Sequence, residues 1–62
     1  MIMVKRLNGE SFAINENLIE TIEERPDTVI TLTNGNKYIV KEKIVDIIQK
    51  IKEFKEDILK KL

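Results

Sequence analysis

Few side chains of this chain could carry out chemistry. The sequence has no Cys and no His, and it has one Ser (Ser11) and one Tyr (Tyr38). A catalytic nucleophile needs an adjacent base that activates it, and the residue types that most often form such pairs are missing. The usual zinc ligands are missing as well. We therefore expect no enzymatic activity, no catalytic or cofactor-binding residue, no cofactor and no metal site.

Glu23 and Glu24 are adjacent acids that could suggest general acid and base catalysis. In an extended chain, however, neighbouring side chains point to opposite faces. These two carboxylates therefore cannot act together on one substrate, and we interpret both as solvated.

Lys5 and Arg6 precede a turn, and Phe12 and Tyr38 are aromatic. Such residues contact phosphates and stack on bases in proteins that bind RNA on a sheet face. The alternative is that the aromatic rings pack across strands in the core and that the basic pair is solvated. We favour the alternative because acidic residues dominate the surroundings of these side chains. We expect no nucleic-acid partner.

Asn-Gly occurs twice, at residues 8–9 and 34–35, each time followed three positions later by an aromatic residue. Asn-Gly between extended segments indicates a hairpin with a two-residue type I′ turn, in which both central residues have positive φ. Two such hairpins are predicted. A two-residue loop sets the cross-strand partners as Lys5 with Phe12, Met3 with Ile14, Ile30 with Ile39, Val29 with Val40, and Thr31 with Tyr38.

Three further segments complete a small sheet. Residues 2–7 alternate between apolar and polar faces, and residues 28–33 are rich in β-branched side chains. Residues 18–24 fit either a helical face or a strand, and we predict a strand from their β-branched content and short length. The hairpin over residues 28–40 is partly apolar on both faces, which favours a central place in the sheet.

From Lys41 the hydrophobic period changes to that of a helix. Apolar residues recur at alternating spacings of three and four, at Ile44, Ile47, Ile51, Phe54 and Ile58, and the stripe is widened by Val45, Ile48, Leu59 and Leu62. A helix of about twenty residues would be about 30 Å long. We predict one α+β domain over residues 1–62, with a small antiparallel β meander of about five short strands in residues 1–40 and an amphipathic helix in residues 41–62.

A chain of 62 residues buries only about 60% of its unfolded surface, and this one has no disulfide to stabilise it. Small domains then depend on a metal or on a partner chain. A small meander would not cover the whole predicted helix. We therefore predict a homo-oligomer, a dimer or higher, whose interface is formed by Ile47, Ile51, Phe54, Ile58 and Leu62.

The sequence has no apolar run of about 20 residues and no apolar segment typical of a secretory signal. We expect a cytoplasmic location and no membrane insertion.

Four segments resemble one protein family. They are Ile-Met-Val-Lys-Arg-Leu-Asn-Gly at residues 2–9, Leu-Ile-Glu-Thr-Ile-Glu at residues 18–23, Pro-Asp-Thr-Val-Ile-Thr-Leu-Thr-Asn-Gly at residues 26–35, and Lys-Tyr-Ile-Val-Lys-Glu at residues 37–42. Together they look like the small FlbD/SwrD family of flagellar proteins, along the whole chain. The resemblance implies a cytoplasmic accessory protein of bacterial flagellar motility, associated with motor power and swarming. It implies stator or motor proteins at the inner membrane as partners, and it supplies no catalytic or ligand residue.

Two alternatives share this architecture. One is an RNA-binding post-transcriptional regulator of the carbon-storage type, which is also a small β domain with a short C-terminal helix. The other is a module that only oligomerises. The balanced charge argues against the first, and every physical feature of the second is shared with a motility factor.

Overall fold

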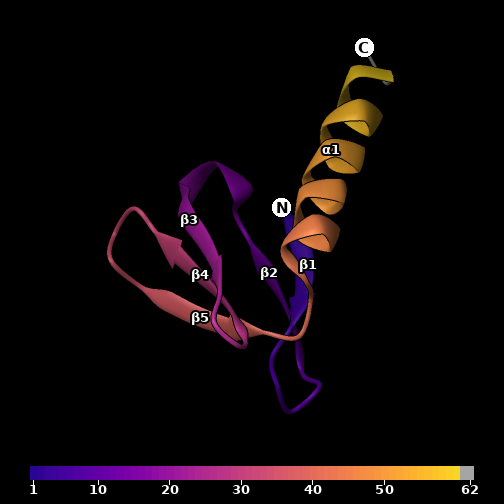
Figure 1. Cartoon of the computed structure of the whole chain (residues 1–62). Helices are drawn as coiled ribbons and strands as arrows, with labels where there is room; N and C mark the ends of the chain where they lie inside the picture. Colours follow the sequence, from indigo (N-terminus) through magenta and orange to yellow (C-terminus); the bar gives the residue numbers. More distant parts are fainter. Residues whose placement is uncertain (61–62) are drawn as a thin grey trace.

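The computed structural model describes residues 1–60, and its side chains are described for residues 1–56. Five short antiparallel strands precede one C-terminal helix (Figure 1). The elements are β1 (Ile2–Lys5), β2 (Ser11–Ile14), a 3-10 helix (Glu16–Leu18), β3 (Ile19–Glu24), β4 (Thr28–Leu32), β5 (Lys37–Val40) and α1 (Ile44–Lys60). The predicted α+β fold class is confirmed, and so is the strand predicted within residues 18–24.

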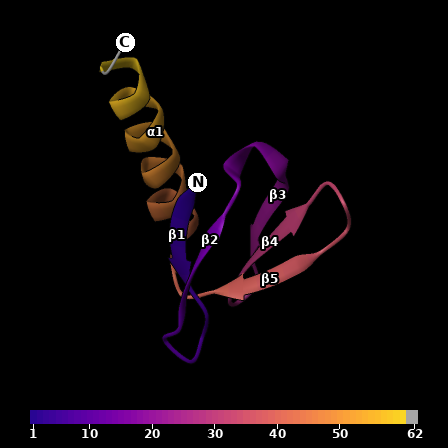
Figure 2. The same ribbon diagram turned by 180° about the vertical axis from the view of Figure 1, so that it is seen from behind.

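The strands divide between two sheets, one of β1 and β2 and one in the order β3-β4-β5. An isolated antiparallel bridge between Arg6 and Val40 joins the sheets, and the Lys41 N–H donates to the Lys5 carbonyl at 2.9 Å beside it. From this corner the two sheets diverge, as Figures 1 and 2 show. The division follows from the 3-10 helix, which separates β2 from β3 where a meander would have a hairpin.

The core lies between the two sheets and the base of α1. It contains seven buried hydrophobic residues: Ile2, Val4, Ile14, Ile30, Leu32, Val40 and Ile47. In β1 and β4 every second residue is buried, as expected for strands with one face turned inward. Six half-buried residues pack around this core: Phe12, Ile19, Ile22, Tyr38, Ile51 and Phe54. β4 is the central strand of its sheet, as the apolar character of the 28–40 hairpin predicted.

The two Asn-Gly turns differ from the prediction. The Gly9 N–H donates to the Arg6 carbonyl at 2.9 Å, and the Arg6 N–H donates to the Glu10 carbonyl at 2.8 Å. Gly35, Leu32 and Asn36 repeat this arrangement in the second hairpin. Each loop therefore has three residues, and the predicted two-residue type I′ turn is wrong.

The reason is that Asn and Gly have different roles in each loop: Gly has the positive φ, and Asn accepts a hydrogen bond through its side chain. Gly9 and Gly35 have φ values of 90° and 91°, and no other described residue has positive φ. Each Asn instead uses its side chain, since Asn8 Oδ1 and Asn34 Oδ1 accept from the N–H two residues later at 2.9 Å. The extra loop residue shifts both registers by one, to pairs such as Lys5 with Ser11, Val4 with Phe12, Val29 with Ile39 and Ile30 with Tyr38.

α1 begins at Ile44, where two carboxylates accept hydrogen bonds from N–H groups at its start. Asp46 reaches back to the N–H of Lys43 at 3.4 Å, as in one half of a capping box. Glu24, at the end of β3, accepts from the Ile44 N–H at 3.1 Å and lies 3.7 Å from the Lys43 ammonium. Glu24 is exposed, as interpreted, but its carboxylate is also bound, because the sheet carries the end of β3 to the start of the helix. The predicted helix end at Leu62 lies outside the described residues.

Candidate functional site

The predicted interface residues do not form one exposed surface. Ile47 is fully buried in the core of its own chain, and Ile51 and Phe54 are half-buried against the same core. Ile58 belongs to α1, but its side chain, like Leu62, lies outside the described part of the chain. Ile47 therefore has no surface to offer to another protein. The interface itself stays a prediction for the remaining residues.

Among the residues of α1 whose side chains are described, the exposed large hydrophobic ones are Val45 and Ile48, whose exposed fractions are 71% and 55%. Residues three apart on a helix lie about 60° apart around its axis, so both project from one flank. We call this pair the apolar flank. The sequence indicated that some apolar residues of the helix are exposed, because the predicted apolar stripe was wider than the face that a core covers. What it did not show was which part of the stripe turns to the core.

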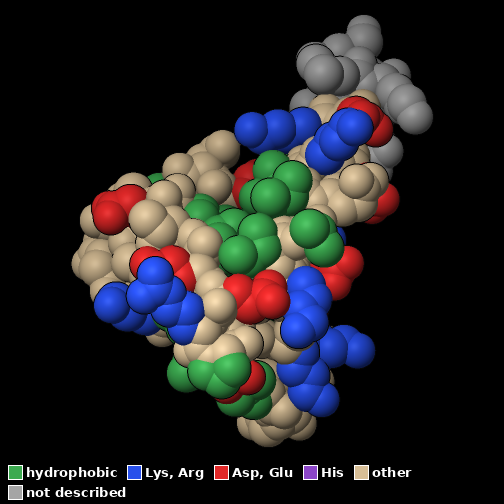
Figure 3. Space-filling view, viewed as in Figure 1, with side chains coloured by type: hydrophobic (Ala, Val, Ile, Leu, Met, Phe, Trp, Pro, Cys, Tyr) green, Lys and Arg blue, Asp and Glu red, His purple; other side chains and the backbone are tan. Residues whose placement is uncertain are grey.

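The space between α1 and β3 is rich in apolar side chains. Figure 3 shows hydrophobic groups gathered on this face, between the lower half of α1 and the strands. β3 contributes the half-buried Ile19 and Ile22, and its Glu24 binds the start of the helix. Large hydrophobic residues are also exposed on other elements, at Met1, Met3, Leu7, Leu18 and Ile39. The apolar flank is distinct in that its two exposed residues lie close together on one helix.

Arg6, Phe12 and Tyr38 meet where the two sheets join. The Arg6 guanidinium lies 4.2 Å from the centre of the Phe12 ring, and the centres of the two aromatic rings are 5.5 Å apart. Both rings pack half-buried against the core, in line with the favoured interpretation. Arg6 differs from that interpretation, because its guanidinium stacks on Phe12 and its Nε lies 3.5 Å from Glu10. The Arg6 guanidinium thus occupies one face of the Phe12 ring.

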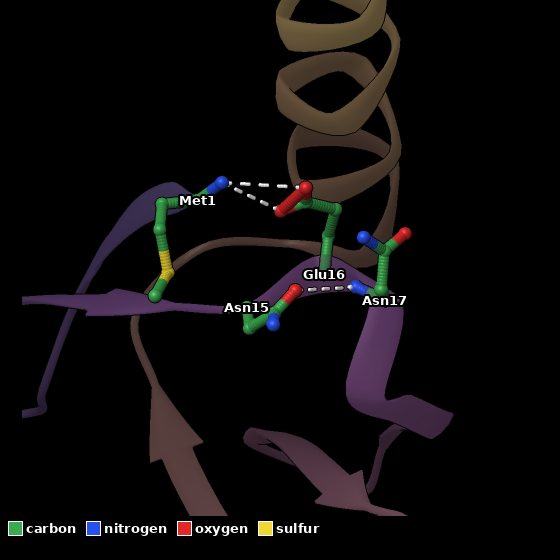
Figure 4. Close-up of polar contacts among 4 residues, drawn as sticks. All are labelled: Met1, Asn15, Glu16 and Asn17. Carbon is green, nitrogen blue, oxygen red and sulfur yellow. Dashed lines mark hydrogen bonds and ion pairs between the residues drawn. The ribbon is translucent and has the colours of Figure 1, made fainter.

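Glu16 forms a polar contact that no sequence pattern indicated. Its side chain is only 4% exposed, and its Oε2 lies 2.9 Å from the Met1 α-ammonium (Figure 4). The hydrogen bond from this ammonium holds the pKa of Glu16 below its ordinary value, against the opposing effect of burial. Next to it, Asn15 Oδ1 accepts from the Asn17 N–H at 3.0 Å and caps the 3-10 helix. Sequence patterns did not indicate this contact, because the cationic partner of Glu16 is the α-ammonium of Met1 and not a Lys or Arg side chain.

The described residues show neither a cluster of metal ligands nor a helix that could span a membrane. No group of three or more acidic side chains in that part of the chain could hold a metal ion. No helix within residues 1–60 is long and apolar enough to cross a membrane.

The comparisons with known proteins agree with the resemblance seen in the sequence. The family model FlbD, described as flagellar and swarming motility proteins, matches residues 1–59 of the 62. Neither the search of curated proteins nor that of solved structures found a match. A match over nearly the whole chain shows the family, and with it a role in motility. The chain belongs to the FlbD family of flagellar and swarming motility proteins.

Proposed function

We propose that this chain is a non-enzymatic accessory protein of bacterial flagellar motility that supports stator function and motor power through protein–protein contacts. The family match supports the motility role. The observation that carries the contact is the apolar flank, where Val45 and Ile48 are mostly exposed on a rigid helix.

The apolar flank favours a protein as the partner. Exposed apolar side chains gathered on one face are typical of protein interaction surfaces, and single scattered ones are not. Val45 and Ile48 are two such residues on one flank of α1. The resemblance to the family suggests stator or motor proteins, which would place the chain on the cytoplasmic side of the inner membrane.

Self-association is part of the same proposal. Seven buried hydrophobic residues make a small core, and the chain has no disulfide to add to its stability. A second copy that covers Val45 and Ile48 would remove them from water, and it would compete with a motor partner for the same flank. A homodimer or higher oligomer would therefore form through α1, with Val45 and Ile48 in the interface instead of the buried Ile47.

Motility in a deletion strain tests the proposal. The strain is complemented with the wild-type gene, with Ile48→Asp, or with the control Ile39→Asp, which alters an isoleucine of similar exposure (48%) on β5. Because Ile48 is exposed, the Asp variant should fold, and a carboxylate in a covered apolar contact costs several kcal/mol. We expect wild type and Ile39→Asp to restore swarming and Ile48→Asp to fail.

A pull-down with the same variants tests the contact with motor proteins separately from the role in motility. Stator and rotor components should be retained by wild type and by Ile39→Asp, and lost by Ile48→Asp. Full restoration of swarming by Ile48→Asp would contradict a role for the apolar flank. A deletion strain with unchanged swimming and swarming torque would contradict the support of the stator.

A further inference from the structure

A shallow open depression lies on the other flank of α1, between the helix and the end of β1. Its volume is about 510 Å³, and it is lined by Lys5, Lys41, Glu42, Asp46, Gln49 and Lys50. It contains neither residue of the apolar flank. The proposed motility contact therefore does not use it.

The backbone holds the floor of this depression in place. The Lys41 N–H donates to the Lys5 carbonyl at 2.9 Å, and the Lys5 N–H donates to both carboxylate oxygens of Glu42 at 3.1 Å. These contacts lie beside the Arg6–Val40 bridge that joins the two sheets. Lys5 and Lys41 therefore lie beside the junction of the two sheets.

The lining charges are unevenly paired. Glu42 accepts from a backbone N–H, and Asp46 accepts from the N–H of Lys43 at the start of α1. None of the three lining lysines forms an ion pair with a carboxylate of the described residues. The lining thus holds three lysines against two acids, a net charge of +1, and both acids also accept hydrogen bonds from the backbone. Gln49 adds a polar side chain at the rim.

The shape and the charge suit a short acidic segment of a protein. An open depression can receive successive carboxylate side chains while their other sides remain in water. A long polyanion fits less well, because the chain is neutral overall and residues 16–27 carry five acidic residues against one arginine. We propose that this depression binds a short segment of a partner protein that carries adjacent Asp or Glu residues.

Fluorescence anisotropy with a labelled hexaglutamate peptide tests the proposal on the full chain. The triple variant Lys5→Gln, Lys41→Gln and Lys50→Gln removes the ammonium groups of the depression. The control Lys37→Gln, Lys52→Gln and Lys55→Gln removes the same total charge from residues that do not line it. We expect the first variant to weaken binding about tenfold and the control to weaken it less than about threefold, since each exposed pair contributes modestly. Raising the ionic strength from about 0.05 M to about 0.3 M should weaken wild-type binding.

A nitrogen–proton correlation spectrum of the wild-type chain supplies a second measurement that needs no variant. The peptide should shift the amide signals of Lys5, Lys41 and Lys50 and leave those of β3 in place. Equal losses in the two triple variants would overturn the proposal, and so would shifts spread evenly over the chain. No binding at about 1 mM peptide would also overturn it. Tighter binding of a labelled hexathymidylate than of the peptide would assign the depression to nucleic acid instead.

Discussion

Glu16 shows how one residue can link the N-terminus to the connection between the two sheets. Its carboxylate belongs to the 3-10 helix, and its cationic partner is the α-ammonium of Met1, which precedes β1. The side chain of Glu16 is almost fully buried, whereas Met1 is 67% exposed on its side of the pair. Solvent therefore screens the ion pair on the Met1 side, so that the pair stabilises the fold less than its short distance alone would suggest.

The pH dependence of unfolding should report this contact. Because the folded-state pKa of Glu16 is lowered, its contribution is fully present above the ordinary Glu pKa of 4.5 and is lost as the pH falls through the lower folded value. We expect Glu16→Gln to lower the free energy of unfolding by about 1 kcal/mol at neutral pH. Below about pH 4.5, the stability of the variant should fall less steeply than that of wild type.

Urea unfolding between about pH 7 and about pH 3 measures both effects. Glu20→Gln is the matched control, since Glu20 is exposed and forms no ion pair within the described residues. It should follow the wild-type curve. Parallel curves for Glu16→Gln and wild type would show that the ion pair adds nothing to stability.

At the scale of elements, α1 depends on β3 for its first turn. Glu24 accepts from the Ile44 N–H and lies near the Lys43 ammonium, so that one carboxylate binds both the helix start and its neighbour. Glu24→Ala should lower the free energy of unfolding by about 1 kcal/mol, which is typical for loss of a helix cap. Glu23→Ala removes the adjacent, 58% exposed acid and should change stability by less than about 0.5 kcal/mol. Thermal unfolding followed by circular dichroism distinguishes the two, and equal effects would contradict the capping role.

The two hairpin loops can be tested at Gly35. Its φ of 91° is unfavourable for a side chain, although no atom lies within 4 Å of where a Cβ would stand. The cost of Gly35→Ala is therefore conformational, and we expect a loss of about 1 kcal/mol. Gly35→Asn should lose less, because Asn adopts positive φ more readily. A loss for Asn equal to that for Ala, measured by urea unfolding, would indicate that another property of Gly35 decides the loop.

At the scale of the whole molecule, the two sides of α1 should respond differently to the same charge. Phe54 packs against the core, so Phe54→Asp should cost about 3 kcal/mol or more and unfold a domain whose core supplies only about 3 to 5 kcal/mol. Ile48 is mostly exposed, so Ile48→Asp should leave the chain folded and shift it from oligomer to monomer. Sedimentation equilibrium together with thermal unfolding measures both outcomes. A wild-type chain that is monomeric and cooperatively folded at all concentrations would contradict self-association. The contact with motor proteins would then be tested by the motility assay alone.

The sequence by itself determined the fold class, the strands, the helix and the family. These features depend on local patterns, namely the alternation in β1 and β4, the Gly positions of the two turns and the change of period after Lys41. Tertiary structure decided what depends on contacts between distant residues. It placed Ile47 in the core and Val45 in water, although both belong to one apolar stripe, because the sheets cover only one side of α1. It also brought Glu24 to the helix and Lys5 to Lys41, pairs that no spacing in the sequence connects.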